Sequence, residues 1–348
     1  MMFPPNPDHI DPTLAVPERL RSLLQQVAEI LAQIATDIAR AAPTDMPIIL
    51  AEHRGTFYGT MDALGRGIID FLAEGPSPKE IGTARAQIAA PIRAWSATSP
   101  VFVRLVRPST KGPRDFEVPA LVLQNQRVGA DISSMVLNDF YLHSLAAQAL
   151  RNRFAMLTRH LLQEVTQRVQ AGVNPVRMLN LKCDTGSELL RLADEPAFAA
   201  AQVTCLDEDS TALRTARARL DERLPVKTRF VRISALKYAR SPLKVPQTYH
   251  ISYAAALWDY LTDHQTVVLI RECYDLLGPD GVLILGCPTR GVPASERVLI
   301  AWVLDQAIHY RDESDFRRLF AQTPFGLETL HFEREPLGGD MLVIAQRP

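Results

Sequence analysis

The sequence predicts an α/β fold in which a mostly parallel sheet, closed by an antiparallel terminal strand, follows a helical N-terminal cap. Beyond Asn174, short apolar runs alternate with amphipathic stretches, which is typical of βα units in a parallel sheet. Residues 326–348 read as two strands joined by the turn "PLGG". The first ninety residues instead place apolar side chains three and four positions apart, the spacing of helices.

Length and composition indicate a folded protein with more than one domain. The chain has 348 residues, of which 47% are hydrophobic and 22% charged, so it can bury a substantial core. We expect a mostly helical cap over residues 1–150 and a sheet domain over residues 151–348. The 38 basic and 39 acidic side chains nearly cancel. No global field therefore favours binding to nucleic acid or to an anionic membrane.

The cysteines and the apolar runs indicate the compartment. The four cysteines show no CxxC pair and no Cys/His pair at zinc-ligand spacing, so no metal site is expected. The stretch "MMFPPNPDHIDPTLAVP" lacks the basic flank and apolar core of a secretion signal. No apolar run is long enough to span a bilayer. A reduced, cytoplasmic protein without a membrane span is therefore the prediction.

Helical spacing and breaker residues define the elements of the cap. We expect helices at 17–42 and 58–74, and one or two more over 76–96, where Pro91 is expected to break the helix. Residues 97–130 read as an irregular connection with a short strand at 118–126, and 137–169 as one helix.

Short apolar runs define the strands of the sheet domain. They predict strands at 176–181, 202–207, 228–233, 249–254 and 281–286, followed by the terminal hairpin. The helices expected between and after them cover 187–194, 210–222, 263–277 and 294–322.

Candidate ligand-binding residues follow the strands, because ligands of such sheets bind outside the strands' carboxyl ends. The first turn holds a single glycine, Gly186, among small residues that would let backbone approach an adenosine and its side arm. Asp207 ends the second strand, where an acid accepts hydrogen bonds from both ribose hydroxyls. Ser234 and Ala235 follow the third strand, near the expected adenine. A solvated carboxylate and an ordinary turn glycine remain open as alternatives, and the acid suits NAD as well as S-adenosylmethionine.

Longer blocks of sequence resemble a known family. They are "YHISYAAALWDYL" at 249–261, "LLGPDGVLILG" at 276–286, "AWVLDQAIHYRDESDF" at 301–316, "TKGPRDFE" at 110–117 and "ALRNRFAML" at 149–157. Together they resemble the bacterial extracellular factor (3-hydroxypalmitate methyl ester) biosynthesis proteins, a class I methyltransferase family dependent on S-adenosylmethionine. The resemblance covers about residues 93–322. It implies a Rossmann-like class I methyltransferase sheet, S-adenosylmethionine as cofactor, and methyl transfer to a small-molecule or acyl substrate in bacterial secondary metabolism or signal synthesis.

The resemblance also assigns roles to individual residues. Asp207 would bind the ribose, Glu188 the ammonium of the methionyl arm, and Tyr253 would face the sulfonium through a cation–π contact. The cap residues 93–153 would shape the acceptor pocket. The candidate cofactor-binding residues are Asn180, Asp184, Gly186, Glu188, Asp207, Glu208, Ser234 and Ala235; the catalytic candidates are Tyr253, Asp259 and Tyr260; the substrate-binding candidates are Arg151, Arg153, Tyr310 and Arg311.

Several positions depart from the family pattern. Asp184 stands where the family has a glycine, and its carboxylate would repel that of the methionyl arm unless a cation intervenes. Ala254, Ala256 and Cys287 also differ. Alternatives therefore stay open: a cyclase or lyase that releases methylthioadenosine from S-adenosylmethionine, a non-catalytic methyltransferase-like subunit, and a nicotinamide-dependent oxidoreductase, the last disfavoured because GxGxxG is missing. A homodimer or a related partner subunit is equally open.

Overall fold

The computed structural model describes residues 16–106, 115–126, 128–221, 223, 227–241 and 248–348. The chain forms two compact units. The first contains the described residues of Met1–Pro108, Gln124–Ala147 and Pro293–Ala307, and the second those of Ser109–Leu123, Gln148–Val292 and Ile308–Pro348. A single boundary at residue 150 was predicted, whereas the units interleave: the segment 293–307 belongs with the N-terminal helices.

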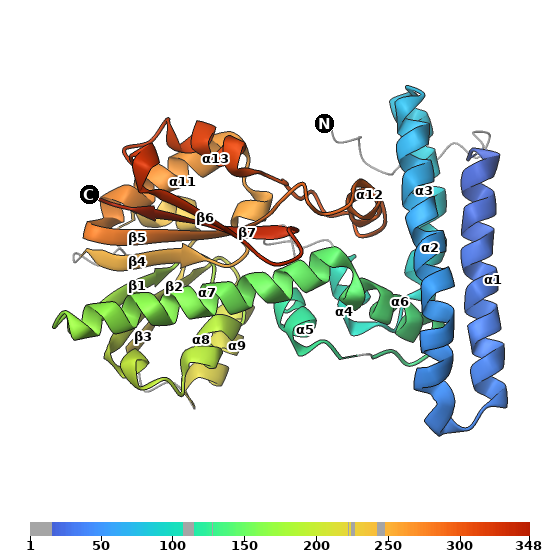
Figure 1. Ribbon diagram of the computed structural model, residues 1–348, viewed down its shortest axis with the longest axis horizontal. Coiled ribbons are helices and arrows are strands. Elements are labelled where there is room, and N and C mark those ends of the chain that lie inside the picture. Colours follow the sequence, from blue (N-terminus) through green and yellow to red (C-terminus); the bar gives the residue numbers. More distant parts are fainter. Residues whose placement is uncertain (1–15, 107–114, 127, 222, 224–226, 242–247) are drawn as a thin grey trace. The chain divides into compact units, whose positions relative to one another are not determined.

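The first unit is helical within its described residues. The helices α1 and α2 lie side by side (Figure 1), and α1 buries Leu20, Val27, Leu31 and Ile34 at the spacing that predicted the helix. The helices of this unit are α1 (Glu18–Arg40), α2 (Met46–Ala73), α3 (Pro78–Trp95), α4 (Pro100–Leu105), α6 (Ile132–His143) and α12 (Ala294–Val303).

The second unit is built around a seven-stranded sheet of order β3-β2-β1-β4-β5-β7-β6. The pairs among β1 to β5 are parallel, whereas β7 is antiparallel to both β5 and β6, as the terminal hairpin predicted. The strands are β1 (Val176–Asn180), β2 (Ala201–Asp207), β3 (Lys227–Arg232), β4 (Tyr249–Ala254), β5 (Leu277–Pro288), β6 (Leu330–Arg334) and β7 (Asp340–Gln346). The predicted α/β class with an antiparallel terminal strand is confirmed.

Helices cover both faces of this sheet (Figure 1). Alternate strand residues enter two separate cores: Met178 packs with α7, α8 and α9, and Leu179 with α11 and α13. The helices are α5 (Val118–Gln124), α7 (Leu145–Gln170), α8 (Ser187–Leu192), α9 (Ser210–Asp221), α10 (Ala235–Tyr238), α11 (Asp263–Leu276) and α13 (Glu313–Phe320). Gln124 and the first three residues of α7 belong to the first unit.

Several predicted helix boundaries are wrong. The helix α3 continues through Pro91, because the proline ring costs one backbone bond while Ile88 and Ile92 remain buried. The strand expected at 118–126 is the helix α5. The helix expected at 137–169 begins earlier and is interrupted at Ser144, which caps α6 with extended backbone. The helix expected at 294–322 is two helices, α12 and α13, with residues 304–312 outside both.

Some predictions fall outside the described residues. Most of the N-terminal segment 1–17 and residues 110–114 of the block "TKGPRDFE" belong to the undescribed ranges. No helix of the described chain has the length and apolar character required to cross a membrane.

Candidate active site

A cavity of about 270 Å³ lies at the carboxyl ends of β1 to β4, beside the point where the strand order reverses between β1 and β4. One end is polar, with Lys182, Asp207 and Glu208, whereas the remaining wall is mostly apolar. The lining side chains are Leu181, Lys182, Asp207, Glu208, Ile233, Ser234, Ala235, Leu236, Ala256, Leu257, Tyr260, Leu261, Gln265 and Leu269. A mostly apolar pocket with a few convergent polar groups is the usual form of a small-molecule or cofactor site.

Asp207 is the buried acid of this cavity, with 2% of its surface exposed. Its Oδ1 accepts a hydrogen bond from the backbone N–H of Asp209 at 2.9 Å. Its Oδ2 accepts from Lys182 Nζ at 2.8 Å and from the backbone N–H of Asp184 at 3.0 Å. Burial raises the pKa of Asp207, and the Lys182 ammonium opposes that rise. Asp207, which the sequence predicts to bind a ribose, therefore lies at the carboxyl edge of the sheet. Three donors of the protein already use part of its hydrogen-bonding capacity.

The turn after β1 explains how one glycine suffices. Asp184 and Gly186 both adopt left-handed backbone, with φ of +47° and +63°. Aspartate tolerates this conformation better than most residues, so only the second position requires glycine. A Cβ on Gly186 would also lie 2.9 Å from Leu220 Cδ1. The turn therefore adopts left-handed backbone at two positions with a single glycine.

Lys182 supplies the cation that the acidic turn requires. Its ammonium lies 3.0 Å from Asp184 Oδ1 and 2.8 Å from Asp207 Oδ2, and 18% of its side chain is exposed. Lys182 was not among the predicted site residues. The sequence does contain a local indication, because a lysine two positions before an aspartate in a tight turn can pair with that aspartate. It contains no indication of the second partner, Asp207, which is 25 residues away.

Asn180, Glu188 and Tyr253 form a buried polar cluster behind the turn. Glu188 Oε1 accepts from Asn180 Nδ2 at 2.6 Å and from the Tyr253 hydroxyl at 3.2 Å. Burial raises the pKa of Glu188 to about 7 and raises that of Tyr253 as well. Tyr253 is fully buried in the core beneath α7. Among the described residues, neither Tyr253 nor Glu188 lines the cavity, so their predicted contacts with a sulfonium and an ammonium stay predictions.

Arg153 and Asp259, whose predicted roles in substrate binding and catalysis stay predictions, form an ion pair with each other. Arg153 Nη1 and Nη2 donate to the two oxygens of Asp259, both at 3.0 Å, and Arg153 Nε lies 3.2 Å from Asp340 Oδ2. All three side chains are buried. This ion-pair triad joins α7 to the 3₁₀ turn Trp258–Tyr260 and to β7. The guanidinium of Arg153 is thus buried and already paired with two carboxylates.

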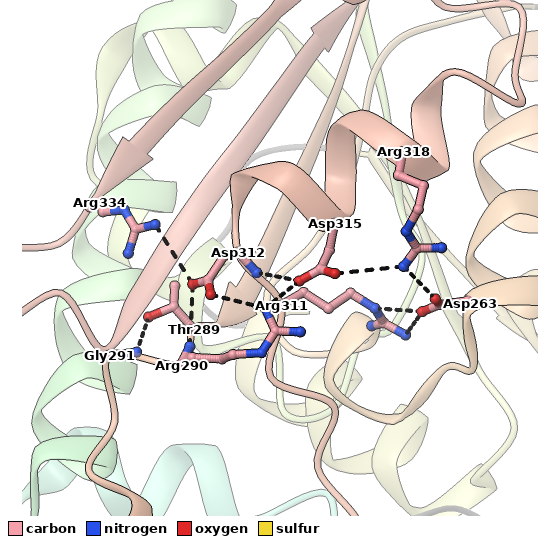
Figure 2. A network of polar contacts seen from close by, with 9 residues as sticks. All are labelled: Asp263, Thr289, Arg290, Gly291, Arg311, Asp312, Asp315, Arg318 and Arg334. Carbon is pink, nitrogen blue, oxygen red and sulfur yellow. Dashed lines mark hydrogen bonds and ion pairs between the residues drawn. The ribbon is translucent and has the colours of Figure 1, made fainter. Parts of the chain in front are cut away.

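Arg311 holds the segment that follows β4. It donates to the carbonyl oxygens of Trp258, at 2.9 Å, and of Leu261, while its Nε donates to Asp263 at 3.1 Å. Figure 2 shows Arg311 and Arg318 converging on Asp263 from two sides. Since Leu261 lines the cavity, Arg311 positions one wall rather than reaching the lumen. Arg151 and Tyr310 are half-buried.

A second group of ion pairs in Figure 2 joins residues that come before and after the segment 293–307 in the chain. Arg290 Nη1 lies 3.0 Å from Asp312 Oδ2 and 2.6 Å from Asp315 Oδ2, and Arg334 lies 3.7 Å from Asp312 (Figure 2). Arg290 precedes this segment and Asp312 follows it. Their ion pair therefore links, within the second unit, the two residues between which the segment is inserted.

The structure sorts the predicted site residues other than Arg151 and Tyr310 into three groups. Asp207, Glu208, Ser234, Ala235 and Tyr260 line the cavity at or just after the ends of β2, β3 and β4, and their predicted contacts with cofactor and substrate stay predictions. Asn180, Asp184, Gly186, Glu188 and Tyr253 build the turn and its support. Arg153, Asp259 and Arg311 serve as structural links. In the described part of the chain no cluster of three or more His, Cys, Asp or Glu side chains is arranged to bind a metal ion.

Comparison with known families adds an independent observation. A family model described as a methyltransferase domain matches residues 178–281, from β1 into the start of β5. Over these residues the chain thus resembles a methyltransferase domain. This match implies S-adenosylmethionine as the cofactor. The buried acid at the end of β2 and the apolar cavity beside it fit the nucleoside part of that molecule. No curated protein matches the chain.

Solved structures resemble this chain in fold. A possible exported protein from Bordetella parapertussis is 17% identical over 98% of this chain and 100% of its own, with a TM-score of 0.56. That likeness concerns the fold alone. Magnesium protoporphyrin IX methyltransferase from Synechocystis PCC 6803, solved with bound S-adenosylmethionine, is 13% identical over 59% of this chain and 84% of its own, with a TM-score of 0.41. The S-adenosylmethionine-dependent methyltransferase SibL is 14% identical over 95% and 96%, with a TM-score of 0.48. These two are too distant to inform function.

Proposed function

We propose that this protein transfers the methyl group of S-adenosylmethionine to a small-molecule or acyl acceptor, in bacterial secondary metabolism or signal synthesis. The observation that carries the proposal is the cavity of the methyltransferase domain, with the buried Asp207 at its polar end. The acceptor class and the biological setting rest on the resemblance of the five sequence blocks to extracellular factor biosynthesis proteins. Four buried, free thiols support a cytoplasmic location.

The charges around the cavity suit S-adenosylmethionine better than a dinucleotide. Asp184, Asp207 and Glu208 outnumber Lys182, so the polar end is acidic. A pyrophosphate would be repelled there, whereas a sulfonium cation would be attracted. This balance supports methyl transfer over nicotinamide-dependent oxidation.

The chain's own residues would contribute binding and alignment. When bound, S-adenosylmethionine supplies an activated methyl group on a sulfonium, which is already a good leaving group. Asp207 would orient the ribose, and the apolar wall of Ile233, Leu257 and Leu261 would exclude water from the nucleoside. No general acid or base is needed at the donor.

Calorimetric titration tests the proposal. The wild-type protein should bind the product S-adenosylhomocysteine with a dissociation constant of about 1 μM and should not bind NAD. Asp207→Asn should weaken the binding about tenfold to a hundredfold, because a charged hydrogen bond contributes about 1.5–3 kcal/mol. Asp221→Asn, an exposed carboxylate at the end of α9, is the matched control and should leave affinity unchanged. Binding of NAD without S-adenosylhomocysteine would refute the cofactor assignment.

A non-catalytic methyltransferase-like subunit is the second candidate, favoured by the occupation of Asp207 by Lys182. It requires that the wild-type protein bind no S-adenosylhomocysteine. It also requires that Asp184→Gly, which removes one carboxylate from the turn, create measurable affinity. The two candidates therefore give opposite results in the same titration.

A further inference from the structure

Lys182 bridges two carboxylates from different strand ends at the polar end of the cavity. Its ammonium lies 2.8 Å from Asp207 and 3.0 Å from Asp184, with 18% of the side chain exposed. Asp184 and Asp207 are buried more deeply, with 7% and 2% of their surface exposed. In such a partly desolvated site the interactions among the three charges are much stronger than on the surface.

The hydrogen bonds to Asp207 leave too few acceptor positions for a ribose. A carboxylate offers about four positions, and in the described structure three are taken, by Lys182 Nζ and by the backbone N–H groups of Asp184 and Asp209. Two neighbouring ribose hydroxyls need two positions. The backbone donors are fixed by the turn, whereas the lysine side chain is flexible, so Lys182 is the donor that can leave.

We propose that Lys182 exchanges partners when the ligand binds and selects nucleosides that carry an amino-acid arm. The ribose hydroxyls replace the ammonium on Asp207, while Lys182 stays paired with Asp184 and turns its charge to the carboxylate of the arm. The inference rests on the proposed function, because it assigns the ribose to Asp207.

The charge balance explains why the arm requires this lysine. Without Lys182, the carboxylate of the arm would approach a turn that carries Asp184 and lies beside Asp207, both negative. With Lys182, the ammonium stands between them as the cation that the aspartate-bearing turn needs. A nucleoside without a carboxylate gains nothing from the ammonium and must still displace it from Asp207. Lys182 therefore favours ligands with the arm and disfavours those without it.

Two ligands and two lysine variants test the exchange. Calorimetry would compare S-adenosylhomocysteine, which has the arm, with methylthioadenosine, which lacks it, on the wild type, Lys182→Met and Lys227→Met. Lys227 is an exposed lysine at the first residue of β3, at the opposite, amino end of the strands. Lys182→Met should weaken S-adenosylhomocysteine at least about tenfold, the loss of one charged contact, and leave methylthioadenosine unchanged or tighter. Lys227→Met should change neither affinity.

The other outcomes overturn the inference. If Lys182→Met weakens the binding of both ligands equally, Lys182 only supports the structure of the turn. If the variant binds both ligands as tightly as the wild type, Lys182 has no role in ligand binding. If the variant binds both ligands more tightly than the wild type, Lys182 obstructs the site. If the wild type binds neither ligand, the proposed function fails as well. Lys182→Arg keeps the charge and should keep the preference for S-adenosylhomocysteine, which tests the exchange even if the methionine variant is unstable.

Discussion

Replacement of Arg153 by methionine tests whether the buried triad is structural. The substitution removes two 3.0 Å hydrogen bonds to Asp259 and the 3.2 Å contact with Asp340. Burial already raises the pKa of Asp340, and Arg153 opposes that rise. Two buried carboxylates would lose their counter-charge, and removal of one partner of a buried pair costs about 3–5 kcal/mol. We expect Arg153→Met to lower the free energy of unfolding by that amount.

The assay uses Trp258, which is fully buried beside Asp259 in the second unit. In a background with Trp95→Phe and Trp302→Phe, Trp258 is the only tryptophan of the chain and reports urea unfolding of this unit. Arg159→Met is the matched control: Arg159 is on the same helix, 59% of its side chain is exposed, and it pairs with Glu333. An exposed pair contributes at most about 1 kcal/mol.

The comparison of the two variants is decisive. If Arg153→Met costs no more than Arg159→Met, the triad does not stabilise the fold, and Arg153 returns to the substrate-binding role that the sequence predicted. Adding Asp259→Asn to Arg153→Met should recover part of the loss, because one uncompensated carboxylate is then neutral.

Two further substitutions test the packing and the charge of the site. Because the pKa of Glu188 is raised from 4.5 to about 7, its protonation stabilises the fold below pH 4.5 and this stabilisation is lost as pH rises through 7. Urea unfolding should therefore find Glu188→Gln close to the wild type at pH 4 and up to about 3 kcal/mol more stable at pH 8; a pH-independent difference would contradict the shift. Gly286→Ala would place a Cβ 2.6 Å from the Ala255 carbonyl oxygen and 2.8 Å from Arg153 Cδ. Gly286→Ala should lower the free energy of unfolding by about 1–3 kcal/mol. Gly55→Ala is the control: Gly55 lies within α2, nothing lies within 4 Å of a Cβ placed there, and the substitution should not lower the free energy of unfolding.

The sheet could be predicted from the sequence because buried parallel strands read as continuous apolar runs. Each of the seven strands was expected within a few residues, and so was the antiparallel end. The helices were less predictable where local signals compete with packing. Pro91 reads as a breaker, yet α3 continues because its apolar face stays buried. The segment 118–124 has strand-like composition, and burial of Val118, Ala120 and Val122 occurs on a helix instead.

The candidate site could be predicted only where it depends on strand ends. Asp207, Ser234 and Ala235 line the cavity because they lie at or just beyond the carboxyl ends of β2 and β3. Arg153 and Asp259 are 106 residues apart, and nothing in their spacing reveals that they pair. Their polarity and their position beside a ligand-binding strand predict function equally well whether the side chains face a cavity or each other. Only the packing of α7 on the sheet distinguishes the two cases.

Asp184 shows why a departure from a family pattern has to be judged together with its neighbours. Alone, an aspartate in place of a turn glycine introduces strain and an opposing charge. In this turn its backbone adopts φ of +47°, which aspartate tolerates, and its carboxylate is neutralised by Lys182 at 3.0 Å. Its N–H also donates to Asp207, so Asp184 helps to hold in place the acid that we propose to bind the ribose. Both the shape and the charge balance of the turn are thus maintained by the substituted residue and the lysine two positions before it. A turn released from ligand binding would need neither compensation, and for that reason the aspartate favours an altered but working site over a vacant one.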